Sequence, residues 1–167
     1  MKIAIYGNSR QNAFLPQIAE FLKLLDKNGI EIYMSGHFSD YLLKNDIPQS
    51  WIVLHDFAGA DIDRVISIGG DGTFLRAAQW VGRSQVPILG INTGHLGFLA
   101  SYSLDETDEL IKAILNPVVT VEPRMLLHIE CAGMPDDFWP YALNEVAFMK
   151  SDTSSCLLYT SPSPRDA

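Results

Sequence analysis

The sequence is poor in cysteine and contains no long apolar run. Its two cysteines, Cys131 and Cys156, lack the paired spacing of a zinc site or a disulfide framework, so we expect free thiols in a reducing compartment. The apolar stretch of residues 3–6 is cut off by Gly7, too soon for a signal peptide, and no run approaches the ~20 residues of a membrane span. These absences favour a cytoplasmic protein without a membrane partner.

Basic residues are also few. Twelve lysines and arginines stand against twenty acidic residues, which gives a formal net charge of -8. A broad electrostatic grip on nucleic acid is therefore not expected, and any phosphate site must be local, built from backbone N–H groups and a few cations. Apolar side chains, in contrast, are plentiful: 47% of the 167 residues are hydrophobic, which is enough for a sizeable core.

Residues 1–118 alternate between strand-like and helix-like segments. Short apolar runs predict strands over residues 2–7, 31–35, 64–70 and 86–92. Amphipathic segments between and after them predict helices over residues 13–29, 38–45, 73–82 and 103–116. Ser103 and Glu106 open the last of these at capping-box spacing. Such alternation indicates parallel strands covered on both faces, so we predict an α/β fold, a Rossmann-like open sheet, for this N-terminal domain.

The pattern changes after Pro117. Residues 120–133 and 139–150 are strand-like, and the turn-rich segment between them contains no helical pattern. We therefore predict the beginning of a β-rich second domain over residues 119–155. Residues 156–167, "CLLYTSPSPRDA", fit neither pattern. They are either a natural Ser/Pro-rich disordered tail or, as we expect, non-native sequence that resembles vector or adapter read-through.

The stretch "VISIGGDGTFLRAA", residues 65–78, surrounds one aspartate with three glycines between a strand and a helix. Glycines let the backbone approach a ligand, and the first N–H groups of the following helix can bind an oxyanion. A carboxylate beside phosphates is unfavourable unless it has a chemical role, and Asp71 is placed to accept the proton of an alcohol that attacks phosphorus. Taken alone, a Gly-Gly-Asp-Gly tetrad can also be an ordinary tight turn.

Two further segments strengthen this interpretation. "PILGINTGHLGFLA", residues 87–100, again ends a strand in a glycine-punctuated loop. "LNEVAFM", residues 143–149, places Asn144 and Glu145 inside a strand-like run, where a charge requires a partner. Together with "GGDGT", and in this order, these segments resemble those of the NAD kinase family over roughly residues 1–155. The resemblance implies an enzyme that phosphorylates the 2′-hydroxyl of the adenosine ribose of NAD and yields NADP.

The same resemblance assigns the phosphoryl transfer to the turn. It implies that Asp71 is the general base, that Gly70 and Gly72 line the phosphate path, and that Arg76 faces the dinucleotide. For Arg76 the alternative is a solvated helix residue without a role. The implied phosphoryl donor is ATP or polyphosphate, with Mg²⁺ or another divalent metal as cofactor. We predict no metal-ligating residue.

The resemblance assigns NAD binding to the two later segments, residues 87–100 and 143–149. The resemblance implies that Phe98 packs against a base, with ordinary core packing as the alternative, and that Asn144 and Glu145 hydrogen-bond NAD hydroxyls and polar base atoms. It further implies a homo-oligomer for the full-length protein. His37, His55 and His128 are scattered along the chain and receive no role.

After Ser155 the sequence departs from the family. The resemblance implies a β-rich domain with a Gly-Ser-Thr-Ala-Tyr type segment and a further aspartate that complete the NAD site, and neither occurs in these 167 residues. The chain therefore looks like the N-terminal portion of an NAD kinase, truncated and followed by a non-native tail. We expect little or no kinase activity from this chain by itself.

Two alternatives are open from the residues alone. Diacylglycerol and sphingosine kinases, and phosphofructokinases, also carry a Gly-Gly-Asp-Gly tetrad, but "NTGHLGF" and "NEVAF" favour an NAD kinase. The other alternative is a dinucleotide-binding module without catalysis. Asp71 argues against it, because a pure binder has no reason to hold an unpaired carboxylate beside phosphates.

Overall fold

A computed structural model describes residues 1–94, 97–100, 102–135, 138–143 and 145–146. The chain divides into two compact units, Met1–Arg124 and Met125–Ala167, and each is described by itself. Within the described residues, no helix combines the length and the apolar character needed to cross a membrane.

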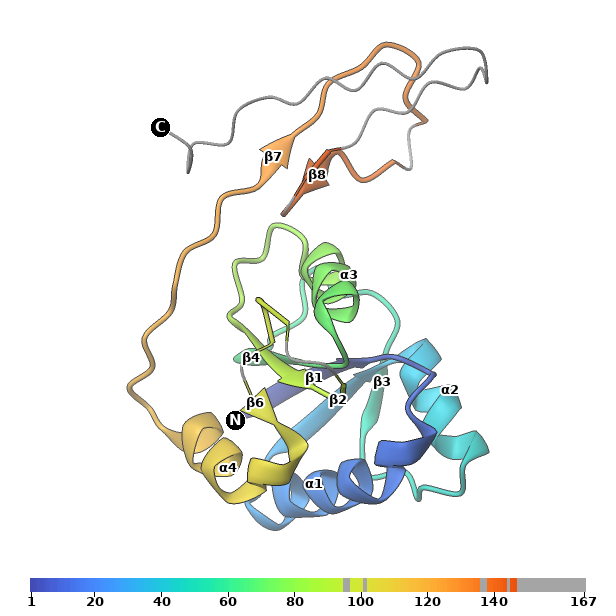
Figure 1. Ribbon diagram of the computed structural model, residues 1–167, viewed down its shortest axis with the longest axis vertical. Coiled ribbons are helices and arrows are strands. Elements are labelled where there is room, and N and C mark those ends of the chain that lie inside the picture. Colours follow the sequence, from blue (N-terminus) through green and yellow to red (C-terminus); the bar gives the residue numbers. More distant parts are fainter. Residues whose placement is uncertain (95–96, 101, 136–137, 144, 147–167) are drawn as a thin grey trace. The chain divides into compact units, whose positions relative to one another are not determined.

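A six-stranded sheet forms the centre of the first unit, with strand order β3-β2-β1-β4-β5-β6 (Figure 1). Each neighbouring pair in this sheet is parallel. The strands are β1 (Lys2–Gly7), β2 (Glu31–Ser35), β3 (Ile52–Leu54), β4 (Arg64–Ile68), β5 (Ile88–Asn92) and β6 (Tyr102–Ser103). The prediction of an α/β open parallel sheet is confirmed.

Helices cover both faces of this sheet. They are α1 (Leu15–Lys27), α2 (Gly36–Lys44), α3 (Asp71–Val81) and α4 (Thr107–Leu115), with short 3-10 turns η1 (Asn12–Phe14) and η2 (Leu104–Glu106) before α1 and α4. Helices α1 and α4 lie on one side of the sheet and α3 lies on the other (Figure 1). Parallel strands need such helical crossovers, so both sheet faces become buried.

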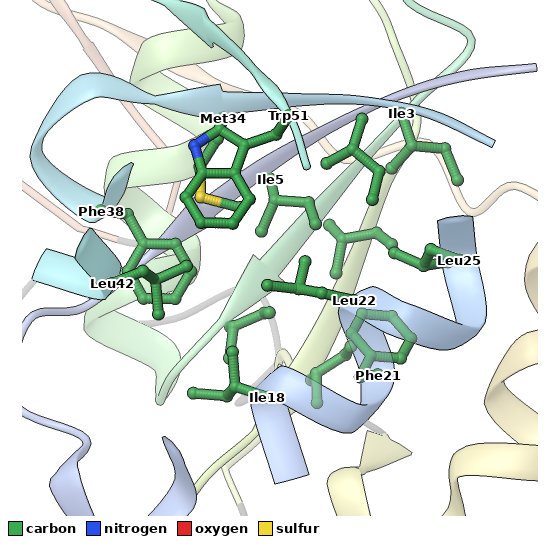
Figure 2. Close-up of a cluster of buried hydrophobic side chains, with 14 of the residues drawn as sticks. Ile3, Ile5, Ile18, Phe21, Leu22, Leu25, Met34, Phe38, Leu42 and Trp51 are labelled. Atoms are coloured by element: carbon green, nitrogen blue, oxygen red, sulfur yellow. The ribbon is translucent and has the colours of Figure 1, made fainter. Parts of the chain in front are cut away.

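The larger part of the core lies between the sheet and helix α1. Four side chains of α1 at helical spacing point to the sheet and are almost completely buried: Ile18, Phe21, Leu22 and Leu25. Figure 2 shows them beside Ile3 and Ile5 of β1 and near Phe38 and Leu42 of α2. Full burial of one such side chain contributes about 1.5–3 kcal/mol, so this cluster supplies much of the stability of the unit.

A smaller apolar cluster covers the opposite face. It combines Ala4 of β1 and Val65 of β4 with Val81 of α3 and with Phe57, and Trp80 packs against it. The ring centroids of Phe57 and Trp80 lie 4.9 Å apart in an edge-to-face arrangement. Helix α3, which begins at the glycine-rich turn, is thereby fixed to the sheet.

The strand order places a topological switch point between β1 and β4. The chain leaves β1 toward α1 on one face and leaves β4 toward α3 on the other, in the 3-2-1-4-5-6 order of dinucleotide-binding sheets. In such sheets, ligands bind in the crevice beyond the carboxyl ends of the two strands at the switch point. The fold therefore selects one edge of the sheet for the site.

The second unit contains a small antiparallel sheet. Strands β7 (Leu127–His128) and β8 (Tyr141–Ala142) pair Leu127 with Ala142 and His128 with Tyr141. The rings of His128 and Tyr141 are stacked with centroids 4.8 Å apart. An antiparallel pair without an intervening helix confirms the predicted change of fold class after residue 118, whereas the predicted bounds of the domains stay a prediction.

Candidate functional site

The loop after β1 lies against the end of β4. The backbone carbonyl of Ile68 accepts hydrogen bonds from Asn8 N at 3.2 Å and from Gln11 Nε2 at 2.8 Å. On the other side, Gly69 N donates to the carbonyl of Ile91 on β5 at 2.9 Å. The carboxyl edge of the sheet at the switch point is thus formed by the loop of residues 8–11, the turn of residues 69–71 and the end of β5.

Gly69 determines the shape of the turn. Its φ of 151° is one that other residues rarely adopt, and a Cβ at this position would collide with the side chain of Thr73. Thr73 N and Phe74 N both donate to the carbonyl of Gly70, at 2.9 and 3.1 Å, so helix α3 begins at Asp71, two residues earlier than predicted. The N–H groups of Gly70, Asp71 and Gly72 donate to no acceptor among the described residues.

Gly70 and Gly72 differ from Gly69. Both have ordinary backbone conformations, both are exposed, and a Cβ on either would meet no described atom within 4 Å. The fold of the chain itself therefore does not require glycine at these two positions. Close approach of a ligand to the free N–H groups is a physical reason for their small size.

Asp71 connects the turn to the loop that follows β5. Its Oδ2 accepts a hydrogen bond from Phe98 N at 2.9 Å, and its Oδ1 accepts one from Leu99 N at 3.1 Å. Gly97 makes this contact possible, because a Cβ there would overlap the Asp71 carboxylate. An ionised carboxylate offers about four acceptor positions, so two remain after both amide bonds are counted. The half-buried carboxylate is held in place and can still accept another proton donor.

Phe98 is almost completely exposed, at 98% of its reference surface. The alternative of ordinary core packing is therefore wrong for this side chain. Its neighbour Ala100 is buried and its Cα would lie 2.7 Å from a Cβ on Gly90, so the loop end is packed tightly on β5. The loop thus holds a large apolar ring in solvent, next to the two amides that bind the Asp71 carboxylate.

Arg76 lies on the exposed surface of α3. Burial raises the pKa of the Tyr6 hydroxyl, and the positive charge of Arg76 partly opposes this rise. Trp80, four positions after Arg76 on α3, has its ring centroid 5.5 Å from that of Tyr6. Asp71, by its amide bonds, faces the loop after β5.

Two predicted site residues remain, Asn144 and Glu145. Glu145 belongs to the second unit and is exposed, and Asn144 lies outside the described residues. The assignment of this pair to NAD recognition stays a prediction.

No group of three or more His, Cys, Asp or Glu side chains that could hold a metal ion occurs among the described residues. A divalent metal would therefore not find a preformed cage in this part of the chain. Mg²⁺ commonly binds proteins through one or two carboxylates together with substrate phosphates, and a single residue such as Asp71 does not define such a site.

Sequence reasoning missed three features of the site. They are the amide donors of Phe98 and Leu99, the need for glycine at position 97, and the contact of His37 Nε2 with the carbonyl of Gly7 at 2.7 Å. The glycine in "HLGF" is the one signal that could have pointed to a close approach in that loop. The partner of Gly97 is 26 positions away, so only the fold shows it.

The fold and site together define a doubly wound α/β domain with an aspartate at a glycine-rich turn after β4. Residues 3–119 match the model of the ATP-NAD kinase N-terminal domain. The chain belongs to this family. The match also separates it from the other kinases that carry a Gly-Gly-Asp-Gly turn.

Individual relatives of the chain are also NAD kinases. The chain is 45% identical over 159 residues to the NAD kinase of Bacteroides fragilis, which covers 94% of this chain and 54% of that protein. It is 38% identical over 158 residues to the NAD kinase of Porphyromonas gingivalis, over 93% of this chain and 54% of the relative. The chain thus spans about half the length of the curated relatives it matches.

A solved structure supports the fold. The crystal structure of yeast NADH kinase complexed with NADH superposes with a TM-score of 0.59 over 77% of this chain and 38% of that chain. The sequence identity is 18%, so this likeness concerns the arrangement of the elements alone.

Proposed function

We propose that the protein carrying this chain transfers the terminal phosphoryl group of ATP to the 2′-hydroxyl of the adenosine ribose of NAD and yields NADP. Family membership and the two relatives named NAD kinase support this reaction. Polyphosphate is a second donor to be tested. A cytoplasmic location and a homo-oligomeric full-length protein belong to the same proposal.

The observation that carries the proposal is the anchored carboxylate of Asp71. Two backbone amides fix its orientation beside the turn and leave acceptor positions open. In the reaction, Asp71 accepts the proton of the ribose hydroxyl as its oxygen attacks the terminal phosphorus, and the bond from that phosphorus to the rest of the donor breaks, which releases ADP. General-base assistance of this kind is typically worth about 10²–10⁴ in rate.

The neighbouring residues take binding roles in this proposal. Gly70 and Gly72 leave room for phosphate oxygens at the free N–H groups of the turn, and exposed Phe98 packs against a base of NAD. Asn144 and Glu145 bind NAD hydroxyls. A divalent cation would neutralise donor phosphates, and the described residues form no preformed cage for it.

Two variants of the full-length protein separate catalysis from loop positioning. Asp71→Asn removes the base and one amide acceptor, whereas Gly97→Ala disturbs the contact between loop and carboxylate but retains the carboxylate. In an NADP-forming assay with ATP and Mg²⁺, we expect kcat to fall by about 10²-fold or more for Asp71→Asn. For Gly97→Ala we expect mainly a higher KM for NAD.

Equal losses of kcat in the two variants would show that Asp71 only positions the loop. Normal turnover of Asp71→Asn would remove Asp71 as the base. Tight NAD binding without any turnover in the unaltered full-length protein would instead favour a dinucleotide-binding module.

A further inference from the structure

Gln11 is a buried polar residue in the loop that follows β1, with only 4% of its surface exposed. Its Nε2 atom donates to the backbone carbonyl of Ile68 at 2.8 Å, and its backbone N–H donates to the hydroxyl of Tyr41 on α2 at 3.2 Å. The Tyr41 hydroxyl in turn donates to Asn12 Oδ1 at 2.8 Å. The loop is therefore joined to α2 on one side and to the end of β4 on the other.

The carbonyl that Gln11 contacts belongs to the peptide group between Ile68 and Gly69, where β4 ends and the glycine-rich turn begins. Its oxygen also accepts from Asn8 N at 3.2 Å, so both of its lone pairs are used. The N–H of the same peptide group donates to the carbonyl of Ile91 on β5 at 2.9 Å. This one peptide group is thus held from both sides, and the turn that carries the proposed base follows it directly.

The oxygen of the Gln11 side-chain amide does not contribute to this hold. Because the carbonyl of Ile68 can only accept, Nε2 must face it, and Oε1 is left buried without a hydrogen-bond partner in the described part of the chain. A buried acceptor without a partner costs free energy, whereas an apolar side chain of similar shape does not carry that cost.

Loss of the side-chain amide would leave no new group unpaired. Asn8 N would still donate to Ile68 O, and the backbone N–H of residue 11 would still donate to Tyr41. Stability alone therefore does not favour glutamine at this position over an apolar residue of the same size. The hydrogen bond from Nε2 to the start of the turn is the feature that only the amide supplies.

We propose that Gln11 is a positioning residue, which holds the peptide group between Ile68 and Gly69 so that the turn presents Asp71 in one orientation. This inference rests on the proposed function. Gln11 acts through the backbone, from the β1 side, while the amides of the loop after β5 hold the Asp71 carboxylate from the other side. A displacement of about 1 Å at reacting groups can lower a rate by about 10²-fold, so a small movement of the turn is sufficient to matter.

Two variants of the full-length protein test this role. Gln11→Met removes the amide and keeps a side chain of similar length. Gln17→Met is the matched control, because Gln17 on α1 also has a buried Oε1 without a described partner. In an NADP-forming assay with ATP and Mg²⁺, we expect Gln11→Met to lower kcat about tenfold or more and to change the KM for NAD less than about twofold. We expect Gln17→Met to have a normal kcat.

Urea unfolding of the same variants separates positioning from stability. The unfolding midpoint of Gln11→Met is expected to equal or exceed that of the unaltered protein, because a buried unpaired acceptor is removed. A general structural role predicts the opposite, which is a lower midpoint.

Amide hydrogen exchange tests the position of the turn without turnover. In Gln11→Met, we expect the N–H of Gly69, which donates to Ile91 O, to exchange about tenfold or more faster than in the unaltered protein. Amides in the middle of β1 and β2 are expected to keep their rates, and Gln17→Met is expected to change none of them.

The inference is overturned if Gln11→Met has a normal kcat, if Gln17→Met loses as much activity, if the unfolding midpoint of Gln11→Met falls, or if the exchange of Gly69 stays unchanged. If the unaltered full-length protein forms no NADP, the proposed function fails. The unfolding midpoint and the exchange of Gly69 then decide whether Gln11 positions the turn.

Discussion

At the residue scale, the Asp71 carboxylate holds a loop and, in the proposed reaction, also serves as the base. Its amide bonds to Phe98 and Leu99 hold the loop after β5, and its remaining acceptor positions are available to a substrate hydroxyl. A carboxylate at the first turn of α3 is also favoured by the helix dipole. The same interactions that stabilise the loop therefore orient the proposed base before substrate binds.

We predict opposite effects on stability for alanine substitutions at Gly69 and Gly72. We expect Gly69→Ala to lower the free energy of unfolding by about 1–3 kcal/mol or more, because its positive φ is strained for alanine. The collision with Thr73 adds to this loss. We expect Gly72→Ala, which lies in α3 with open space around it, to raise the free energy of unfolding by up to about 1 kcal/mol. Urea unfolding followed by circular dichroism measures both, and a stable Gly69→Ala would contradict the described turn.

The pKa of Tyr6 depends on its burial and on the positive charge of Arg76. Burial raises this pKa above the ordinary value of a tyrosine, and Arg76 lowers it. Removing the positive charge makes the tyrosinate less favourable, so Arg76→Gln is expected to raise the pKa further, whereas Arg83→Gln is not. An NMR titration with ¹³C-labelled tyrosine measures the value. An unchanged Tyr6 pKa in Arg76→Gln would place Arg76 away from β1.

Some of this residue-scale detail could be predicted and some could not. Asp71 was identified because glycines surround it between a strand and a helix, which is a local pattern. Its partners Phe98 and Leu99 follow 27 and 28 positions later, and no local pattern reports such a contact. For Phe98 the sequence predicted contact with a base and left core packing open as the alternative; only the structure shows that the ring is exposed.

At the scale of elements, Arg64 connects the sheet to the end of α4. Its guanidinium donates to the carbonyls of Ile114 at 2.7 Å, Asn116 at 2.7 Å and Ala113 at 3.3 Å. The last carbonyls of a helix have no partners within the helix, so a cation there satisfies them and also interacts favourably with the helix dipole.

We predict that Arg64→Met destabilises the domain by about 1–3 kcal/mol, because hydrogen bonds from a charged donor are lost from the end of α4. Arg83→Met, at an exposed position without these bonds, serves as the control and is expected to change stability by less than about 0.5 kcal/mol. Urea unfolding compares the two variants. Equal stability of both would show that Arg64 contributes nothing as a cap.

Prediction of helices and strands succeeded for the longer elements and failed for the shortest strands. The predicted strands over residues 2–7 and 31–35 coincide with β1 and β2. Strands β3 and β6 span only three and two residues and were missed, because such short runs carry no period. Ser103 does cap the following turn, but its Oγ accepts from Asp105 N at 3.2 Å.

At the scale of the whole molecule, sheet order is what creates the site. The alternation of strands and helices predicted parallel pairing and two covered faces. It did not predict that β1 lies between β2 and β4, since that order depends on which face each crossover takes. The switch point, and with it the neighbourhood of Asp71, Tyr6 and Phe98, follows from that order.

We predict that the 167-residue chain self-associates through its second unit. Its strands have two residues each, and Met125, Leu127 and Phe138 are largely exposed, at 92%, 51% and 48%. Short pairs with exposed apolar side chains are marginally stable and tend to associate. We expect the sedimentation coefficient to rise with concentration and the amides of residues 125–135 to exchange quickly. A monomer with protected amides there would contradict this.

The same chain is predicted to have little or no kinase activity. It spans 54% of the length of its Bacteroides fragilis relative, and the family resemblance assigns part of the NAD site to the portion not covered. A steady-state assay of NADP formation with ATP and Mg²⁺ compares the 167-residue chain with the full-length protein. Normal turnover of the shorter chain would show that residues 1–167 already contain the complete site.

The most direct test of the central claim is a crystal structure of the full-length protein with NAD bound. The account predicts an oxygen of Asp71 within about 2.6–3.2 Å of the ribose 2′-oxygen, or joined to it through one water, while Phe98 N and Leu99 N still donate to the carboxylate. A carboxylate turned away from the ribose, without a route to that oxygen even through water, would contradict the account.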